Sequence, residues 1–199
     1  MSIATFTIGP EHQGQTMSLD DFDKCESRDG YLYELAGGVV VVINVPKPRH
    51  GLVVRECRKQ LDAYDSDHPG RIQALFGGAE CKVLIPTAET ERHPDLALYL
   101  SPCPDPDEDI WSSWIPELVI EVVSKSSSNR DYVEKRADYL KAEIQEYWIL
   151  DSFQNRMTQL IRADSEWTEQ ILDRTSIVES TLLPGFEFDL KRVFDAAKR

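Results

Sequence analysis

The sequence predicts a single α/β domain, with a mixed central β-sheet flanked by helices and β-rich additions at its N- and C-terminal ends. Segments of period-two apolar alternation are interleaved with segments of helical spacing, which indicates strands and helices that share one core. Two strongly apolar strands, at 95–100 and 117–123, lie in the middle of the chain. No internal repeat or linker divides residues 1–199, so one domain is expected.

Composition limits the class of protein. The chain has 199 residues, of which 41% are hydrophobic and 29% are charged, as in globular proteins with one well-packed core. No apolar run approaches the roughly 18 residues of a membrane span. The N-terminus shows no basic region followed by an apolar core, so we expect a cytoplasmic protein without membrane contact. The four cysteines form no Cys-x-x-Cys pair, which argues against a zinc knuckle or a disulfide framework.

The N-terminal part of the chain begins with residues 1–17, which are polar with little pattern and are expected to form an irregular leader. A short helix is predicted at 17–22, where Ser18 can cap the first turn. The β-rich segments 31–35 and 39–44 are joined by two glycines, and this pattern predicts a hairpin.

A longer helix is predicted after Pro48. It carries one apolar stripe from Val53 to Tyr64, with His50 at its start. A polar loop, 86–92, then leads to Pro-Asp and the first apolar strand. Further strand candidates are 71–76, 79–85, 147–150, 156–162, 167–173 and 186–188.

The strand 117–123 contains an anomaly. A buried strand is usually apolar on both faces, yet Glu121 stands near the end of this one. The following charged helix, 131–143, is predicted to bury a stripe made of Val133, Ala137, Leu140 and Ile144. Lys135 lies away from that stripe on the helical wheel, so it reaches the strand ends only if the helix crosses over them.

Two acids mark a candidate metal site. Asp95 starts one apolar strand and Glu121 is near the end of the next, so neighbouring strands would bring both carboxylates to one ion. The backbone carbonyl of Val122 is a natural third ligand. Mg²⁺, or Mn²⁺, prefers a few carboxylate oxygens and retains waters. A nearby lysine would orient the attacking water during phosphodiester hydrolysis.

The chain resembles the PD-(D/E)XK nuclease superfamily and, within it, the family named putative restriction endonuclease. The resemblance runs along nearly the whole sequence and rests on these segments: 17–22, 33–35 with Gly38, His50, Pro94-Asp95, 116–124, Asp131 with Lys135 and Tyr139, 146–151 and 183–186. It implies a restriction-endonuclease-like core, a two-carboxylate metal site and cleavage of DNA. Because both strands of a duplex must be cut, a homodimer is also expected.

The catalytic lysine is the departure from the superfamily pattern. That pattern places a lysine two residues after the second acid, where this chain has Val123. The resemblance favours Lys135 as the replacement, because the family recruits a lysine from the following helix. Lys125 is the alternative closer in sequence to Glu121, and Lys82 is a third candidate.

Glu34 and His50 are candidate neighbours of the site. Glu34 is either adjacent to the metal or a polar residue on a strand face, and His50 is either a hydrogen-bonded core histidine or a catalytic group. The net charge of −13 argues against broad, non-specific DNA binding. Two alternative hypotheses therefore stand: a non-catalytic binding or assembly module that retains the nuclease fold, or a nuclease acting on RNA or small nucleotides.

Overall fold

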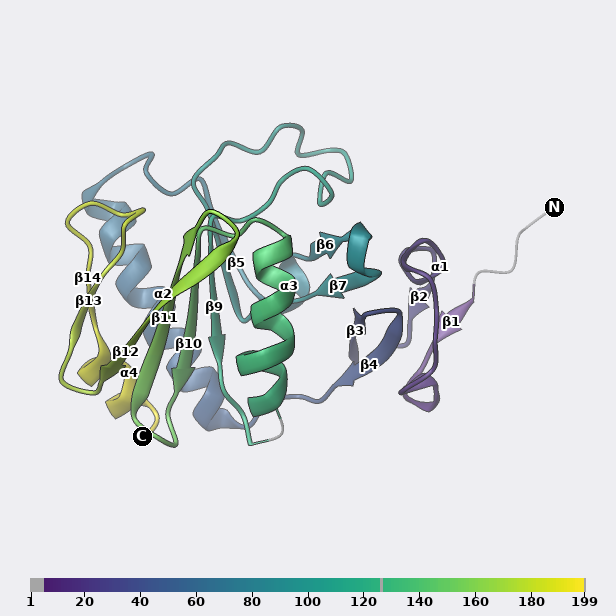
Figure 1. Cartoon of the computed structure of the whole chain (residues 1–199), viewed down its shortest axis with the longest axis horizontal. Helices are drawn as coiled ribbons and strands as arrows, with labels where there is room; N and C mark the ends of the chain where they lie inside the picture. The colour runs from purple at the N-terminus through teal and green to yellow at the C-terminus, as the bar shows by residue number, and fades with distance from the viewer. Residues whose placement is uncertain (1–5, 126, 199) are drawn as a thin grey trace.

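The computed structural model of the protein describes residues 6–125 and 127–198. Its centre is a six-stranded sheet in the order β12-β11-β10-β9-β8-β5 (Figure 1). Strands β9 and β10 are parallel, and the other neighbours are antiparallel, which confirms the predicted mixed sheet. The strands are β5 (Ala74–Phe76), β8 (Leu96–Tyr99), β9 (Leu118–Val122), β10 (Glu146–Asp151), β11 (Arg156–Ala163) and β12 (Glu166–Asp173).

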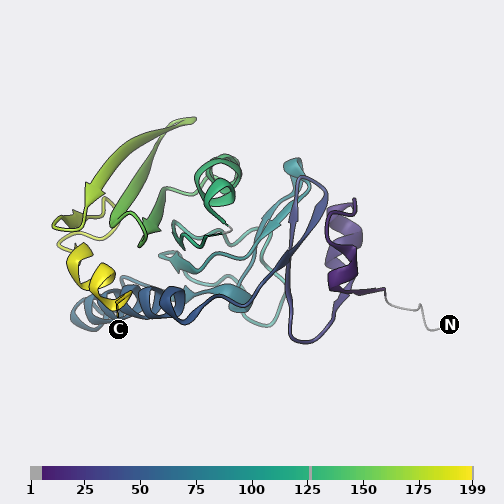
Figure 2. The ribbon, with the colours of Figure 1, turned by 90° about the horizontal axis from the view of Figure 1, so that it is seen from below.

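Helices cover both faces of this sheet. Helices α2 (Pro48–Asp67) and α4 (Leu190–Ala196) pack on one face and α3 (Lys135–Lys141) on the other (Figure 2). The side chains of β9 alternate as predicted: Ile120 belongs to the core cluster under α2 and α4, and Val119 to the cluster under α3. Glu121 follows the same alternation and points to the α3 side.

A second, four-stranded sheet has the order β4-β3-β7-β6, with β3 (Leu32–Ala36), β4 (Val39–Ile43), β6 (Val83–Ile85) and β7 (Thr90–Arg92). The predicted hairpin β3–β4 is confirmed. The predicted polar loop 86–92 is wrong in its second half, because β7 is a buried strand that follows a 3-10 turn, η3 (Pro86–Ala88). Its polar side chains find their partners outside the strand, as Arg92 does in Glu34 and Asp138 and Glu91 in His93, so no apolar pattern marks it as a strand.

The ends of the chain carry small additions. The predicted short helix is α1 (Leu19–Asp23), capped by Ser18, whose hydroxyl accepts from the Asp21 N–H at 3.1 Å. Within the expected leader, of which residues 1–5 lie outside the described range, β1 (Thr7–Ile8) pairs with β2 (Glu26–Ser27) and is followed by a 3-10 turn, η1 (Pro10–His12). A further 3-10 turn is η2 (Gly78–Glu80). At the other end of the molecule, β13 (Ile177–Glu179) pairs with β14 (Glu187–Asp189).

No helix in the described part of the chain combines the length and apolarity that a membrane span requires.

The predicted buried stripe of the helix after β9 is wrong at Val133 and Ala137, whereas Ile144 is buried as predicted and Leu140 is half-buried. The helix opens with a π-helical turn, η4 (Arg130–Glu134), and continues as α3. Val133 is 59% exposed and Ala137 is exposed, whereas Asp131 and Lys135 are buried. This charged face can turn inward because both sheets supply partners: Lys135 pairs with Glu121 and Glu34, and Asp138 with Arg92.

Candidate active site

Asp95 is held at the end of the central sheet by its neighbours in β9. The pairing of Leu96 with Ile120 places Asp95 opposite Glu121, one step beyond the register of β8 and β9. The Val122 N–H donates to Asp95 Oδ2 at 2.7 Å. Gly77 supports this position, because a Cβ there would collide with the Asp95 carbonyl oxygen.

His50 lies directly against Asp95. Its Nε2 is 2.9 Å from Asp95 Oδ2, so the first turn of α2 contributes to the site. Burial lowers the pKa of His50, but the hydrogen bond and negative charge of Asp95 outweigh burial and raise that pKa above its usual value. Of the two interpretations considered for His50, the structure shows the hydrogen-bonded histidine, and its partner is Asp95.

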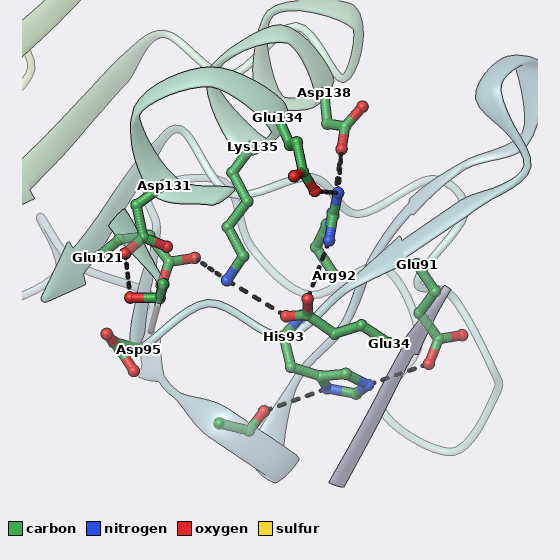
Figure 3. Close-up of polar contacts among 12 residues, drawn as sticks. Glu34, Glu91, Arg92, His93, Asp95, Glu121, Asp131, Glu134, Lys135 and Asp138 are labelled. Carbon is green, nitrogen blue, oxygen red and sulfur yellow. Dashed lines mark hydrogen bonds and ion pairs between the residues drawn. The ribbon is translucent and has the colours of Figure 1, made fainter. Parts of the chain in front are cut away.

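Glu121 is buried and receives two hydrogen bonds on one oxygen. Lys135 Nζ and the Tyr139 hydroxyl each donate to Glu121 Oε1 at 2.7 Å (Figure 3 shows the Lys135 contact). Burial raises the pKa of Glu121. Lys135 opposes this shift, while the nearby Asp95 and Asp131 charges add to it. The positive charge of Lys135 therefore does not offset the combined effect of burial and the neighbouring carboxylates on the pKa of Glu121.

Glu34 extends the site on the other side of Lys135. Its Oε1 lies 3.2 Å from Lys135 Nζ, and its Oε2 accepts from Arg92 at 3.0 Å. Burial favours the neutral acid, but Lys135 and Arg92 outweigh burial and lower the pKa of Glu34 to about 2. Arg92 in turn donates to Asp138 at 2.7 Å. Lys135 is thus positioned between two buried carboxylates, as Figure 3 shows.

Sequence reasoning missed Arg92 and Asp138. Arg92 is 1% exposed but falls in a stretch read as a polar loop, and no local pattern distinguishes a buried arginine from a solvated one. The signal that could have found it was Glu34, a carboxylate in an apolar strand that requires a cation.

Asp131 adds a third carboxyl group near Asp95 and Glu121. It is 2% exposed and accepts from the Ser127 hydroxyl at 2.5 Å. Burial, partly offset by Lys135, raises its pKa to about 6. Figure 3 shows the carboxyl groups of Asp95, Glu121 and Asp131 on the same side of the Lys135 ammonium.

The other candidate lysines lie elsewhere. Lys125 is exposed and its Nζ is 5.9 Å from the centre of the Phe153 ring, so it is not among the partners of Glu121. Lys82 forms an ion pair with Asp23 on the side of the second sheet. Only Lys135 among the three predicted lysines contacts a predicted metal ligand in the described structure.

The donor set fits a hard divalent cation. Both hydrogen bonds to the Asp95 carboxylate fall on Oδ2 and both to Glu121 fall on Oε1, so each acid has a second oxygen for a ligand. In an extended strand the N–H and C=O of one residue face the same side, so the Val122 carbonyl also faces Asp95. No group of three or more His, Cys, Asp or Glu side chains in residues 6–125 and 127–198 forms a metal-binding cluster. Mg²⁺ requires fewer, because it retains waters.

The protein has the restriction-endonuclease-like fold. In its mixed sheet Asp95 and Glu121 lie opposite each other on adjacent strands, and a buried lysine contacts the glutamate. Residues 19–191 match the profile of the family Uma2, described as putative restriction endonuclease, and the chain belongs to this family. The resemblance stated from the sequence is confirmed.

Solved structures support the same fold. The protein is similar to a crystal structure described as a putative nuclease belonging to DUF820 from Anabaena variabilis, with a TM-score of 0.74 and 18% identity. The match covers 91% of this chain and 99% of that one. No curated protein matches the sequence. Family and fold together make the protein a member of a nuclease family.

Proposed function

We propose that the protein is a metal-dependent endonuclease that hydrolyses phosphodiester bonds in DNA. Asp95, Glu121 and the Val122 carbonyl bind Mg²⁺ or Mn²⁺, and Lys135 is the catalytic lysine. The observation that carries this proposal is the 2.7 Å contact between Lys135 Nζ and Glu121 Oε1. It supports Lys135 as the functional replacement for the lysine that the superfamily pattern places at residue 123.

A divalent cation at this site would neutralise phosphate charge and lower the pKa of a bound water. The remaining chemistry comes from the chain. The acidic surroundings, Glu121 and Glu34 above all, outweigh burial and raise the pKa of Lys135, so Lys135 stays protonated at neutral pH. A permanently charged lysine cannot act as a base. It orients the attacking water and stabilises the charge that develops on the phosphate, and solvent protonates the leaving oxygen.

Three further residues position the active groups. Glu34 and Tyr139 hold the Lys135–Glu121 pair, and His50 holds Asp95 through Oδ2. These contacts restrict side-chain rotation before substrate arrives, which is the source of catalytic preorganisation. We also propose a homodimer, because two sites are needed to cut both strands of a duplex.

The test is a cleavage assay on plasmid DNA, single-stranded DNA and single-stranded RNA with Mg²⁺ or Mn²⁺, beside Asp95→Asn and Glu121→Gln. Each variant should lose at least about a hundredfold in rate, since a lost electrostatic contact to the reacting centre typically costs that much. Lys141→Gln, an exposed lysine at the end of α3, is the control and should cleave normally.

Cleavage unaffected by both acid substitutions would contradict the site assignment. Absence of cleavage in every condition, with no metal binding by calorimetry, would support a non-catalytic module. Cleavage of RNA in preference to DNA would correct the substrate.

A further inference from the structure

The charge of the chain poses a problem for any nucleic-acid substrate. With 35 acidic and 22 basic residues, most of the surface repels phosphate. Many basic side chains are also neutralised by ion pairs with acids, such as Arg28 with Glu11 and Arg136 with Glu169. Binding therefore requires cations that lie near the site and have no acidic partner.

Two such cations surround one exposed aromatic ring. The Arg49 guanidinium lies 4.7 Å and the Lys125 ammonium 5.9 Å from the centre of the Phe153 ring, which is 43% exposed. Neither cation forms an ion pair with an acidic side chain in residues 6–125 and 127–198. We call Arg49, Lys125 and Phe153 the Phe153 cluster.

Hydrogen bonds hold the arginine of the Phe153 cluster in one orientation. Arg49 donates from Nε to the Ser152 hydroxyl at 3.2 Å and from a terminal nitrogen to the Ser152 carbonyl at 2.6 Å, which fixes the guanidinium plane. An aromatic ring attracts cations through its quadrupole but does not neutralise them, unlike a carboxylate. The two positive charges therefore stay available to an anion.

The cluster lies beside the candidate active site. Arg49 immediately precedes His50, which contacts Asp95. Lys125 follows β9 in the chain, and Phe153 follows β10. Because Leu150 pairs with Val122, both strands end at the same edge of the sheet. The positive cluster and the carboxylates thus share one end of the sheet.

A third cation, Arg156, follows the turn that carries Phe153. Arg156, which pairs with Asp151 across the β10–β11 hairpin, lies 5.6 Å from the centre of the Tyr132 ring. Its Nε is buried without a hydrogen-bond partner.

We infer that the Phe153 cluster binds a backbone phosphate of the DNA strand next to the phosphate that is cleaved. This inference rests on the proposed function and names the residues that hold the substrate. Arg49 supplies directed N–H donors and Lys125 a mobile point charge, a combination that suits a phosphate contact without base recognition. It explains how an acidic protein holds a polyanion: by a local contact at the site.

The test is binding of fluorescein-labelled duplex and single-stranded DNA, measured in EDTA over a range of KCl concentrations. The variant Arg49→Gln/Lys125→Gln is compared with Arg55→Gln/Lys59→Gln, an equal loss of charge from exposed positions on α2. We expect the first variant to bind at least about tenfold more weakly, with a salt slope smaller by about 1 to 2, since each lost phosphate contact lowers it by about 1. The second should match the wild type.

Phe153→Leu keeps an apolar side chain but removes the ring that positions both cations, so it should weaken binding by less than the double variant does, in which both charges are lost. Thermal melting checks that each variant is folded. If the loss of the Ser152 contacts unfolds the double variant, Lys125→Gln alone carries the test, because that side chain is exposed.

The outcomes separate this inference from the proposed function. If the wild type cleaves DNA and the Arg49/Lys125 variant has the same affinity, salt slope and KM as the control variant, the DNA-binding role of the Phe153 cluster is refuted and the nuclease function stands. Binding that depends on the cluster, without cleavage in Mg²⁺ or Mn²⁺, supports the cluster and refutes the nuclease. A wild type that neither binds nor cleaves refutes both.

Discussion

Replacing Lys135 with Met tests the buried charge network most directly. Lys135 lies between Glu121 at 2.7 Å and Glu34 at 3.2 Å, and its side chain is 6% exposed. Methionine has a similar length but no charge, so the variant leaves Glu121 buried beside Asp131 and Asp95 without its cation. Breaking a buried pair in this way costs about 3–5 kcal/mol of unfolding free energy.

The melting temperature should fall by roughly 6 to 20 °C, at about 2 to 4 °C per kcal/mol for a domain of this size. The exposed Lys141→Met, on the same helix, should stay within about 0.5 kcal/mol of the wild type. Both values can be measured by thermal melting and by urea unfolding at pH 7.

The double variant Lys135→Met/Glu121→Gln sharpens the test. If the single loss comes from an unpaired buried charge, removing that charge should restore at least about 1 kcal/mol relative to Lys135→Met, which is non-additivity typical of contacting residues. Two results would refute the view that ion pairs turn this face of the helix inward: losses of unfolding free energy that simply add in the double variant, or a Lys135→Met variant as stable as the wild type.

Three further predictions follow from the site. Glu34, whose pKa is lowered from 4.5 to about 2, contributes stability that is present above pH 4.5 and is lost as pH falls towards 2. The wild type should therefore have a larger unfolding free energy than Glu34→Gln at neutral pH, by on the order of 3 kcal/mol from linkage, and this difference should shrink below pH 4.5 in urea unfolding. Gly77→Ala should displace Asp95 and so lower both the rate of cleavage and the unfolding free energy, the latter by about 1–3 kcal/mol as in other overpacked sites. Gly51→Ala is the control, because a Cβ at Gly51 on α2 meets open space, and it should change neither quantity. Unchanged cleavage by Gly77→Ala would contradict the packing argument. His50, whose pKa is raised, contributes stability that is full below pH 6.5 and is lost as pH rises through the raised value, so the difference between wild type and His50→Gln should decline in alkaline solution; a difference that grows there would contradict the Asp95 contact.

Local patterns in the sequence predicted much of the fold. The alternation in 117–123, the glycine pair of the β3–β4 hairpin and the capping Ser18 each act over a few residues, and the structure confirms all three. Period-two and helical spacing reflect burial on one face, so they identify elements whose buried face is apolar.

The same reasoning failed where the buried face is charged. The stripe expected at Val133 and Ala137 faces outward, and β7, expected as part of a loop, is an interior strand. In both places the inward side chains are charged and satisfy one another, which a hydrophobic pattern does not register.

By itself, the sequence determined the family, the mixed α/β sheet and the pair of acids, Asp95 and Glu121, as candidates at the ends of adjacent strands. Only the tertiary structure decided which lysine meets them. The helical wheel placed Lys135 away from the core, and Lys125 was closer along the chain, yet Lys135 is buried on Glu121 and Lys125 lies exposed at Phe153. The physical reason is that burying a lysine requires partners, and those partners, Glu34 and Glu121, come from strands that are distant in the sequence and adjacent only in the fold.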